Sequence, residues 1–114
     1  MSYNPFMYEL RHYVDQTGRD LFAQWLDELS DRHVQARIAA RLTRLQNGNF
    51  GDCKSVGDGV WELRVDWGPG YRVYYAIEGK RVVLLCNGGD KRTQAADIAR
   101  AIIRWNEWQT RGKI

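Results

Sequence analysis

The stretch VWELRVDWGPGYRVYYAIEGKRVVLLC, which begins at Val60 and ends at Cys86, decides the fold class. Two turn signals, Gly-Pro-Gly and Glu-Gly-Lys, divide it into three segments, residues 60–67, 71–77 and 81–86. The first segment alternates strictly between apolar and polar side chains, and the other two are rich in β-branched and aromatic residues. The pattern predicts three consecutive antiparallel strands. The third is apolar on both faces, so we expect it to be central in the sheet and covered on both sides.

Two helices are predicted between this meander and an opening strand at residues 6–14. Thr17 and Asp20 have the spacing of a capping box at the start of the first helix, and Ser30 or Asp31 can cap the second. Apolar residues recur at the helical spacing in both segments. They are Leu21, Phe22, Trp25, Leu26 and Leu29 in the first helix, and Val34, Ile38, Leu42 and Leu45 in the second.

The second helix is followed by a glycine-rich connection, residues 47–59, in which Asn47-Gly48 is a suitable helix stop and residues 54–56 are expected to form a short strand. Residues 93–109 predict a final helix. Its expected inner face consists of Ala95, Ile98, Ala99, Ile102 and Trp105. This order of elements is typical of an α+β fold with an antiparallel sheet and a helix hairpin across one face. The length favours a single domain, residues 1–114.

The charge of the chain suggests a polyanionic partner. The formal net charge is +3, and arginine supplies 13 of the 17 basic residues. Arginine pairs bidentately with phosphate and stacks on bases, so nucleic acid is the obvious candidate. The alternative is a solvated basic surface that also pairs with acids within the fold, and composition alone favours this alternative.

Cysteine and histidine usage argues against a disulfide framework or a metal site. Cys53 and Cys86 are isolated from each other, and His12 and His33 lack the spacing of metal ligands. The N-terminal residues lack the pattern of a secretion signal, and no apolar run reaches the length of a membrane span. These features predict a cytoplasmic protein that needs no cofactor and does not contact a membrane.

The segment NGGDKRT, residues 87–93, lies where the third strand of the meander is followed by the final helix. Its glycines permit a tight backbone, and Asp90 or Thr93 can cap the helix. A turn with a helix cap therefore accounts for the segment. It can also form a phosphate site, because Lys91, Arg92 and a helix N-terminus would place positive charge there.

Period two places Glu62, Arg64 and Asp66 on the face of the first meander strand that lies opposite its apolar residues. The predicted register is Trp67 with Tyr71, Asp66 with Arg72, Val65 with Val73, Arg64 with Tyr74 and Leu63 with Tyr75. One sheet face then carries two arginines, two carboxylates and a tyrosine, and Lys91 can approach it from the neighbouring strand. The alternative is a wet sheet face with ion pairs that contribute less than about 1 kcal/mol each.

These residue types suit cleavage of RNA by its own 2′-hydroxyl group. Glu62, or the more distant Asp66, can take the proton of that hydroxyl. Arg64 and Arg72 can hold the phosphate and stabilise the charge that develops on it. Lys91 can stabilise the same charge or protonate the leaving oxygen, and no metal is required. Further RNA contacts are expected from Lys54, Tyr74 and Arg92, although a tyrosine in a sheet also serves for packing.

The segments WELRVDWGPGYRVYY and LLCNGGDKRTQAADI carry a family resemblance that extends over nearly the whole chain. In this order and at this separation they resemble the RelE-like toxins of bacterial type II toxin–antitoxin modules, and more narrowly the HigB-like addiction module killer proteins. The resemblance implies a small α+β ribonuclease fold and cleavage of mRNA, in many members at the decoding site of the ribosome. It also implies a cognate antitoxin, a small helix-turn-helix DNA-binding protein.

The resemblance also implies roles for residues at matching positions. Arg72 matches the phosphate-contacting arginine of RelE-type toxins, Lys91-Arg92 match basic residues that assist the leaving group or the phosphate, and Arg64 matches a basic position beside the catalytic strand. Two positions depart from the pattern. Glu62 lies nearest to the main lysine base of RelE, and no tyrosine is present near Ile98, where RelE has one.

Two other functions are compatible with the same sequence. ParE-like relatives share the fold and poison DNA gyrase without cleaving RNA, since a fold does not fix a function. A passive RNA-binding or ribosome-associated module could use the arginines at 37, 41 and 44, which share one side of the second predicted helix. The same three arginines are also typical of a solvated helix face. They could instead form a surface that binds an acidic segment of an antitoxin or ribosomal RNA.

Overall fold

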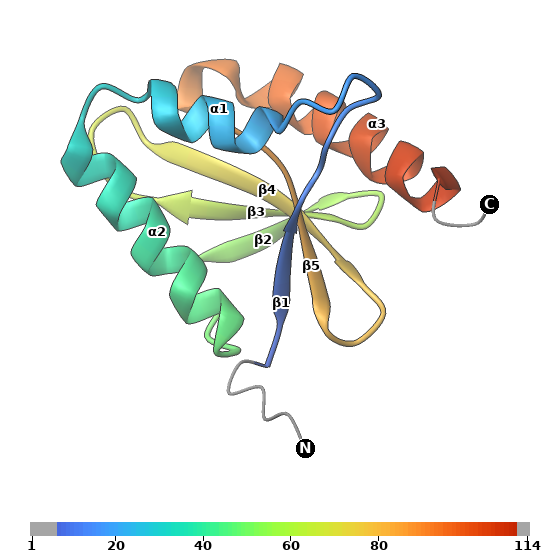
Figure 1. Ribbon diagram of the computed structural model, residues 1–114. Helices are drawn as coiled ribbons and strands as arrows, with labels where there is room; N and C mark the ends of the chain where they lie inside the picture. Colours follow the sequence, from blue (N-terminus) through green and yellow to red (C-terminus); the bar gives the residue numbers. More distant parts are fainter. Residues whose placement is uncertain (1–6, 112–114) are drawn as a thin grey trace.

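A five-stranded sheet is the centre of the molecule (Figure 1), and the computed structural model describes residues 7–111. The strands are β1 Glu9–His12, β2 Cys53–Gly57, β3 Val60–Val65, β4 Tyr71–Glu78 and β5 Val82–Asp90. Their order in the sheet is β1-β5-β4-β3-β2. Strands β3 to β5 form the predicted antiparallel meander, and the predicted short strand, β2, pairs antiparallel with β3. Strand β1 pairs with β5 in the parallel direction. The predicted opening strand is shorter than expected, and its first residue lies outside the described residues.

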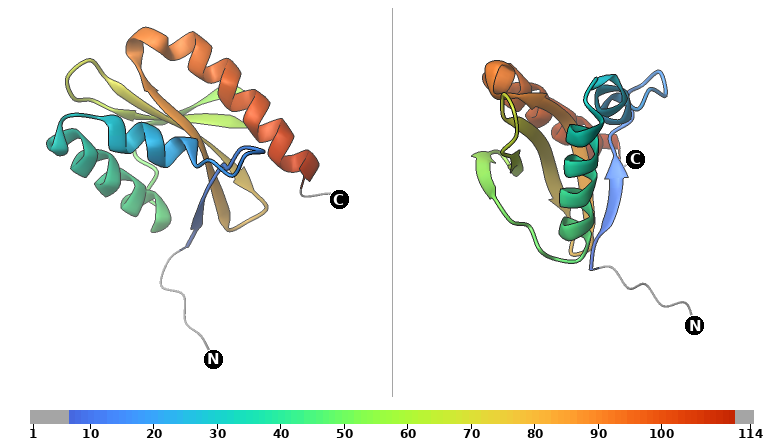
Figure 2. Two further views of the ribbon diagram at one scale, coloured as in Figure 1. Left: turned by 45° about the horizontal axis from the view of Figure 1, so that its top comes forward. Right: turned by 90° about the vertical axis from the view of Figure 1, so that its left-hand side faces the viewer.

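Helices cover both faces of this sheet (Figure 2). They are α1 Leu21–Glu28, α2 Arg32–Gln46 and α3 Gln94–Arg111, and a short 3₁₀ turn, η1 Lys91–Thr93, precedes α3. The hairpin of α1 and α2 packs on one face, and α3 packs on the other. Strand β5 lies inside the sheet, between β1 and β4, and is covered on both sides, as its apolar sequence predicts. Among residues 7–111, no helix is long and apolar enough to cross a membrane.

Two apolar clusters hold the layers together. The first includes the predicted inward stripe of α2, whose four residues Val34, Ile38, Leu42 and Leu45 are all buried against the sheet. The second lies under α3 and contains Tyr13, Val60, Tyr74, Ala76, Leu84, Cys86, Ala101 and Trp105. Both predicted helix ends of α2 are confirmed, because Asp31 caps its start and Asn47 its end, followed by Gly48 with a positive φ of 85°.

The predicted register between β3 and β4 is wrong by two residues. Val65 pairs with Tyr71, so that Arg64 lies opposite Arg72 and Glu62 lies opposite Tyr74. The reason is that β3 ends at Val65 and the connection is longer than the Gly-Pro-Gly signal suggests. Because the shift is an even number of residues, each side chain keeps its predicted face and only the cross-strand partners change.

Residues 87–90 are the end of β5 and not the expected turn. Neither Gly88 nor Gly89 has a positive φ. A methyl group on Gly88 would overlap the ring of Trp25, and one on Gly89 would overlap the carboxylate of Asp97. The two glycines therefore let α1 and α3 approach the opposite faces of this strand. The expected cap is present, because the side chain of Asp90 accepts a hydrogen bond from the backbone N–H of Arg92 at 2.8 Å.

Two local predictions about the helices need correction. Asp20 alone caps α1, accepting from the N–H of Ala23, whereas the Thr17 hydroxyl donates to Asp15 in the preceding loop. In α3 the predicted inner residue Trp105 is buried, but the predicted inner residues Ala95 and Ala99 are exposed, and Asp97 and Ala101 are buried in their place. The first turn of α3 faces a polar part of the sheet, so the residues that it buries do not follow an apolar stripe.

Candidate functional site

A polar pocket with a volume of about 300 Å³ opens beside the loop that joins β3 to β4. Its lining residues are Asp52, Arg64, Asp66, Gly68, Pro69, Gly70, Arg72 and Lys91. We call this site the polar pocket. It brings together three of the four residues that the sequence predicts to be catalytic, Arg64, Arg72 and Lys91. It also contains Asp66, the alternative base, and Asp52, for which the sequence predicts no role.

The three cations reach the polar pocket from different elements. Arg64 on β3 and Arg72 on β4 are cross-strand partners, so period two directs both side chains to the same face. Lys91 follows β5, and its backbone N–H donates to the carbonyl oxygen of Gly70 at 2.8 Å. Gly70 has a φ of 82°, and a Cβ atom there would lie 3.3 Å from Nη1 of Arg72. Glycine therefore provides both the turn and the space for this guanidinium.

Glu62 lies behind the two arginines and has no solvent-exposed surface. Its Oε1 atom lies 3.1 Å from Nε of Arg64 and 3.6 Å from Nε of Arg72. Its Oε2 atom accepts hydrogen bonds from the hydroxyl of Tyr74 at 3.1 Å and from Nε2 of Gln94 at 2.7 Å. The predicted polar face is thus not wet at this position, because the start of α3 covers it. The carboxylate joins β3, β4 and α3.

The environment of Glu62 favours its charged form. Burial raises the pKa of its carboxyl, but the hydrogen bonds from Gln94, Arg64 and Tyr74 and the charge of Arg72 outweigh this effect, so that its pKa lies below the ordinary value of 4.5. A buried carboxylate with a low pKa and occupied lone pairs is a weak proton acceptor. Glu62 also does not line the polar pocket, which leaves Asp66 and Asp52 as the carboxylates that do.

Arg64 and Arg72 share one ion-pair partner, Glu62, within residues 7–111. The side chain of Arg72 is 13% exposed, and its Nε atom has no hydrogen-bond partner. The side chain of Arg64 is 33% exposed and lies directly across the strand pair. Like charges at such positions repel each other, and one carboxylate serves both. A bound anion between the two guanidinium groups would relieve this repulsion.

The remaining predicted RNA contacts lie outside the polar pocket. Arg92 is turned toward Asp90, with Nη2 2.9 Å from its carboxylate, and Lys54 is exposed on β2. Tyr74 is completely buried, so the expected stacking of its ring on a base is wrong for this structure. Burial and the adjacent Glu62 raise the pKa of Tyr74, so its hydroxyl stays protonated and donates to that carboxylate. No group of histidine, cysteine, aspartate and glutamate side chains within residues 7–111 is arranged to hold a metal ion.

Two residues with a place at the site were missed from the sequence. Gln94 lies in the second segment that carries the family resemblance, but nothing in the sequence connects it to Glu62, 32 positions away. Asp52 reaches the polar pocket because the ladder between β2 and β3 continues past Cys53, where the N–H of Arg64 donates to the Asp52 carbonyl at 2.9 Å. Finding Asp52 would have required the register of β2, which its glycine-rich surroundings do not specify.

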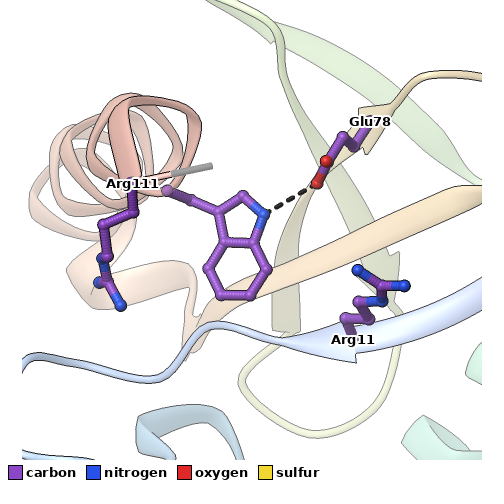
Figure 3. Close-up of a pocket in the computed structure, with 4 residues that line it drawn as sticks. Arg11, Glu78 and Arg111 are labelled. Carbon is purple, nitrogen blue, oxygen red and sulfur yellow. Dashed lines mark hydrogen bonds between the residues drawn. The ribbon is translucent and has the colours of Figure 1, made fainter. Parts of the chain in front are cut away.

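A second pocket lies at the opposite ends of β4 and α3 and differs from the first in its charges (Figure 3). Its lining residues are Arg11, Glu78, Trp108 and Arg111. The indole N–H of Trp108 donates to Glu78 at 2.8 Å, and Arg111 donates to Glu107 at 2.7 Å. Arg11 is 3.3 Å from Glu9. Each charged group thus has a partner already, and no set of cations converges as it does in the polar pocket.

The stability of the protein should depend on pH through Glu62. The pKa of Glu62 is lower in the folded protein than its ordinary value of 4.5. At pH values above 4.5 the charged carboxylate therefore stabilises the folded state, and this contribution is lost as the pH falls through the folded-state pKa. We expect the urea midpoint to fall as the pH is lowered below 4.5. In Glu62→Gln this dependence should be weaker but not absent, since the pKa values of Asp15 and Asp90 are also lowered. If the urea midpoint changed equally with pH in the wild-type protein and in Glu62→Gln, the prediction would be contradicted.

Comparison with known proteins identifies the family. Residues 24–106 match the family described as phage-derived protein Gp49-like (DUF891). The chain belongs to this family. Gp49-like proteins are toxins of toxin–antitoxin, or addiction, modules, so an antitoxin partner is implied. An uncharacterised protein of Haemophilus influenzae is 56% identical over 81 residues, which cover 70% of this chain and 81% of that protein. The matched range includes every residue that lines the polar pocket.

Proposed function

We propose that this Gp49-like protein is an endoribonuclease of the RelE/HigB type, an mRNA interferase that stops translation. The observation that carries the proposal is the convergence of Arg64, Arg72 and Lys91 in one pocket with an accessible carboxylate, Asp66. This set supplies phosphate binding, charge stabilisation and a proton acceptor for attack by the 2′-hydroxyl of RNA. No step of this reaction needs a metal ion or a cofactor.

In the proposed reaction, the scissile phosphodiester lies between Arg64 and Arg72. Asp66 takes the proton of the 2′-hydroxyl, and the 2′-oxygen forms a bond to phosphorus while the bond from phosphorus to the 5′-oxygen breaks. Lys91 gives a proton to the departing 5′-oxygen. The two guanidinium groups stabilise the additional negative charge on the phosphoryl oxygens of the transition state. The products are a 2′,3′-cyclic phosphate and a free 5′-hydroxyl.

Glu62 has a positioning role in this proposal and not the role of base. Its carboxylate lies within 3.6 Å of the Nε atoms of both arginines and is inaccessible to RNA. Fixed cations contribute to catalysis when they need no reorganisation during the reaction, and this carboxylate limits the rotamers of both side chains. Glu62, at the position where RelE has a lysine, thus fits a function in which Asp66 takes the proton.

The proposed setting follows from the substrate. We propose that the protein acts in the cytoplasm on mRNA at the decoding site of the ribosome, and that its antitoxin is a small helix-turn-helix DNA-binding protein. An inhibitor of this site must block the polar pocket or displace one of its cations. Because the polar pocket lies next to the exposed loop between β3 and β4, a bound segment of the antitoxin could cover it directly.

Incubation of the purified protein with mRNA, free and on translating ribosomes, tests the function. We expect cleavage that leaves 2′,3′-cyclic phosphate and 5′-hydroxyl ends, and no cleavage at a site where a 2′-deoxynucleotide replaces the attacking ribonucleotide. The matched control is supercoiling by DNA gyrase in the presence of the same protein. Intact mRNA in both settings together with inhibited gyrase would reject the proposal in favour of the ParE-like function. RNA binding without cleavage or gyrase inhibition would assign the passive RNA-binding function.

A further inference from the structure

A groove on α2, with a volume of about 250 Å³, lies next to the polar pocket. Its lining residues are Arg37, Ala40, Arg41, Arg44, Val65 and Asp66. We call it the α2 groove. It contains three of the chain's arginines and one carboxylate, so its lining is predominantly positive. The three arginines are those that the sequence places on one side of the helix.

The α2 groove and the polar pocket are neighbours at the end of β3. Asp66 lines both of them. The guanidinium of Arg41 donates through Nη1 to the backbone carbonyl of Arg64, and through Nη2 to that of Phe50 at 3.3 Å. Arg41 therefore joins α2 to the strand that supplies Arg64 to the polar pocket. A linear anion that leaves the polar pocket past Asp66 would reach the arginines of α2 next.

The other two arginines of the α2 groove are available for a ligand. Within residues 7–111, Arg37 and Arg44 are exposed and form no ion pair. The guanidinium carbon of Arg37 lies 3.8 Å from the ring centroid of Trp67, which orients this side chain over an indole that is itself 37% exposed. At a rise of about 1.5 Å per residue, Arg37 and Arg41 are about 6 Å apart along the helix axis. The row thus extends along the groove.

We propose that the α2 groove binds the sugar–phosphate backbone of single-stranded RNA next to the phosphodiester in the polar pocket. This inference rests on the proposed function, because it places one strand across both sites. Arg37 and Arg44 contact flanking phosphates, Arg41 keeps the groove aligned with β3, and the exposed indole surface of Trp67 is available to a base. The position of the groove beside the polar pocket, with Asp66 lining both, favours RNA over an acidic protein segment, which would need only the positive charge.

Salt-dependent binding of an uncleavable RNA tests the inference. The probe is a single-stranded RNA oligonucleotide with a 2′-deoxynucleotide at the cleavage site, and the variant is Arg37→Gln with Arg44→Gln. We expect the Kd of the double variant for this RNA to rise about tenfold, because each arginine makes an exposed charged contact that solvent screens. The slope of log Kd against log salt should decrease by about 1.4, or about 0.7 for each lost phosphate contact with a single strand. The loss of affinity in the double variant should be smaller for a dinucleotide, which is too short to reach the α2 groove.

Arg32→Gln is the matched control, because Arg32 is exposed on the same helix but does not line the α2 groove. It should change neither the affinity nor the salt slope. If the double variant binds the oligonucleotide with wild-type affinity and slope, the inference is wrong, even where the wild-type protein cleaves RNA as proposed. Weaker binding of the antitoxin with unchanged binding of RNA would also overturn it and assign the groove to an acidic protein segment. Failure of the proposed function would appear separately, as absence of cleavage by the wild-type protein.

Discussion

Arg72→Ala is expected to reduce the rate of RNA cleavage by about 10²- to 10³-fold, the usual effect of removing one fixed donor from a developing anion. The guanidinium of Arg72 is held by the packing of Gly70 and the carboxylate of Glu62, so it needs no reorganisation to meet the phosphate. Arg72→Lys keeps the charge but loses the planar pair of donors, and it should recover only part of the activity. The measurement is the single-turnover cleavage rate of an RNA substrate.

Arg19→Ala is the control for this prediction, because Arg19 is exposed in the loop before α1 and lies far from the polar pocket in the sequence and outside its lining. It should cleave at the wild-type rate. Circular dichroism of Arg72→Ala must show the wild-type spectrum, since the variant also removes a partner of the buried Glu62. A folded Arg72→Ala protein with wild-type cleavage would show that the polar pocket does not hold the scissile phosphate.

Asp66→Asn is expected to reduce cleavage by about 10²- to 10⁴-fold, the range for removal of a positioned general base. Asp66 is exposed at the edge of the polar pocket, where a 2′-hydroxyl can reach it, whereas Glu62 is enclosed by donors. The measurement is the single-turnover cleavage rate of the same RNA substrate.

Asp52→Asn is the matched carboxylate variant for Asp66, because Asp52 lines the same pocket. It should cleave RNA at close to the wild-type rate. If Asp52→Asn loses cleavage and Asp66→Asn retains it, the base is Asp52 and not Asp66. If Asp66→Asn retains cleavage and Glu62→Gln loses it, the buried carboxylate must become accessible when RNA binds, which would contradict its role as a positioning residue.

The sequence predicts the elements of this fold well, because their periodicity comes from packing. The α2 stripe from Val34 to Leu45 faces a single apolar layer, so one side of the helix is buried and the pattern shows it. The parallel pairing of β1 with β5 is not visible in this way. The partner strand is more than 70 positions away, and no local sequence signal indicates the pairing.

The candidate site is less predictable than the fold, for a physical reason. The sequence indicates correctly that Arg64, Arg72 and Lys91 converge, because period two and the meander order determine where these side chains project. It does not indicate that Glu62 is buried. That depends on the polar first turn of α3, in which Gln94 and Asp97 face inward where an apolar stripe would be expected. Polar contacts between distant segments leave no period in the sequence.

The hydrogen bond between Gln94 and Glu62 has a consequence for the stage of synthesis at which the polar pocket becomes ordered. Strands β3 and β4 carry Glu62, Arg64 and Arg72. The carboxylate of Glu62, which positions the two arginines, is itself held by a hydrogen bond from Gln94 on α3. A nascent chain that has exposed only the meander therefore contains both arginines without their arrangement. Under the proposed function, the polar pocket becomes competent for cleavage only after α3 has been synthesised and has docked on the sheet.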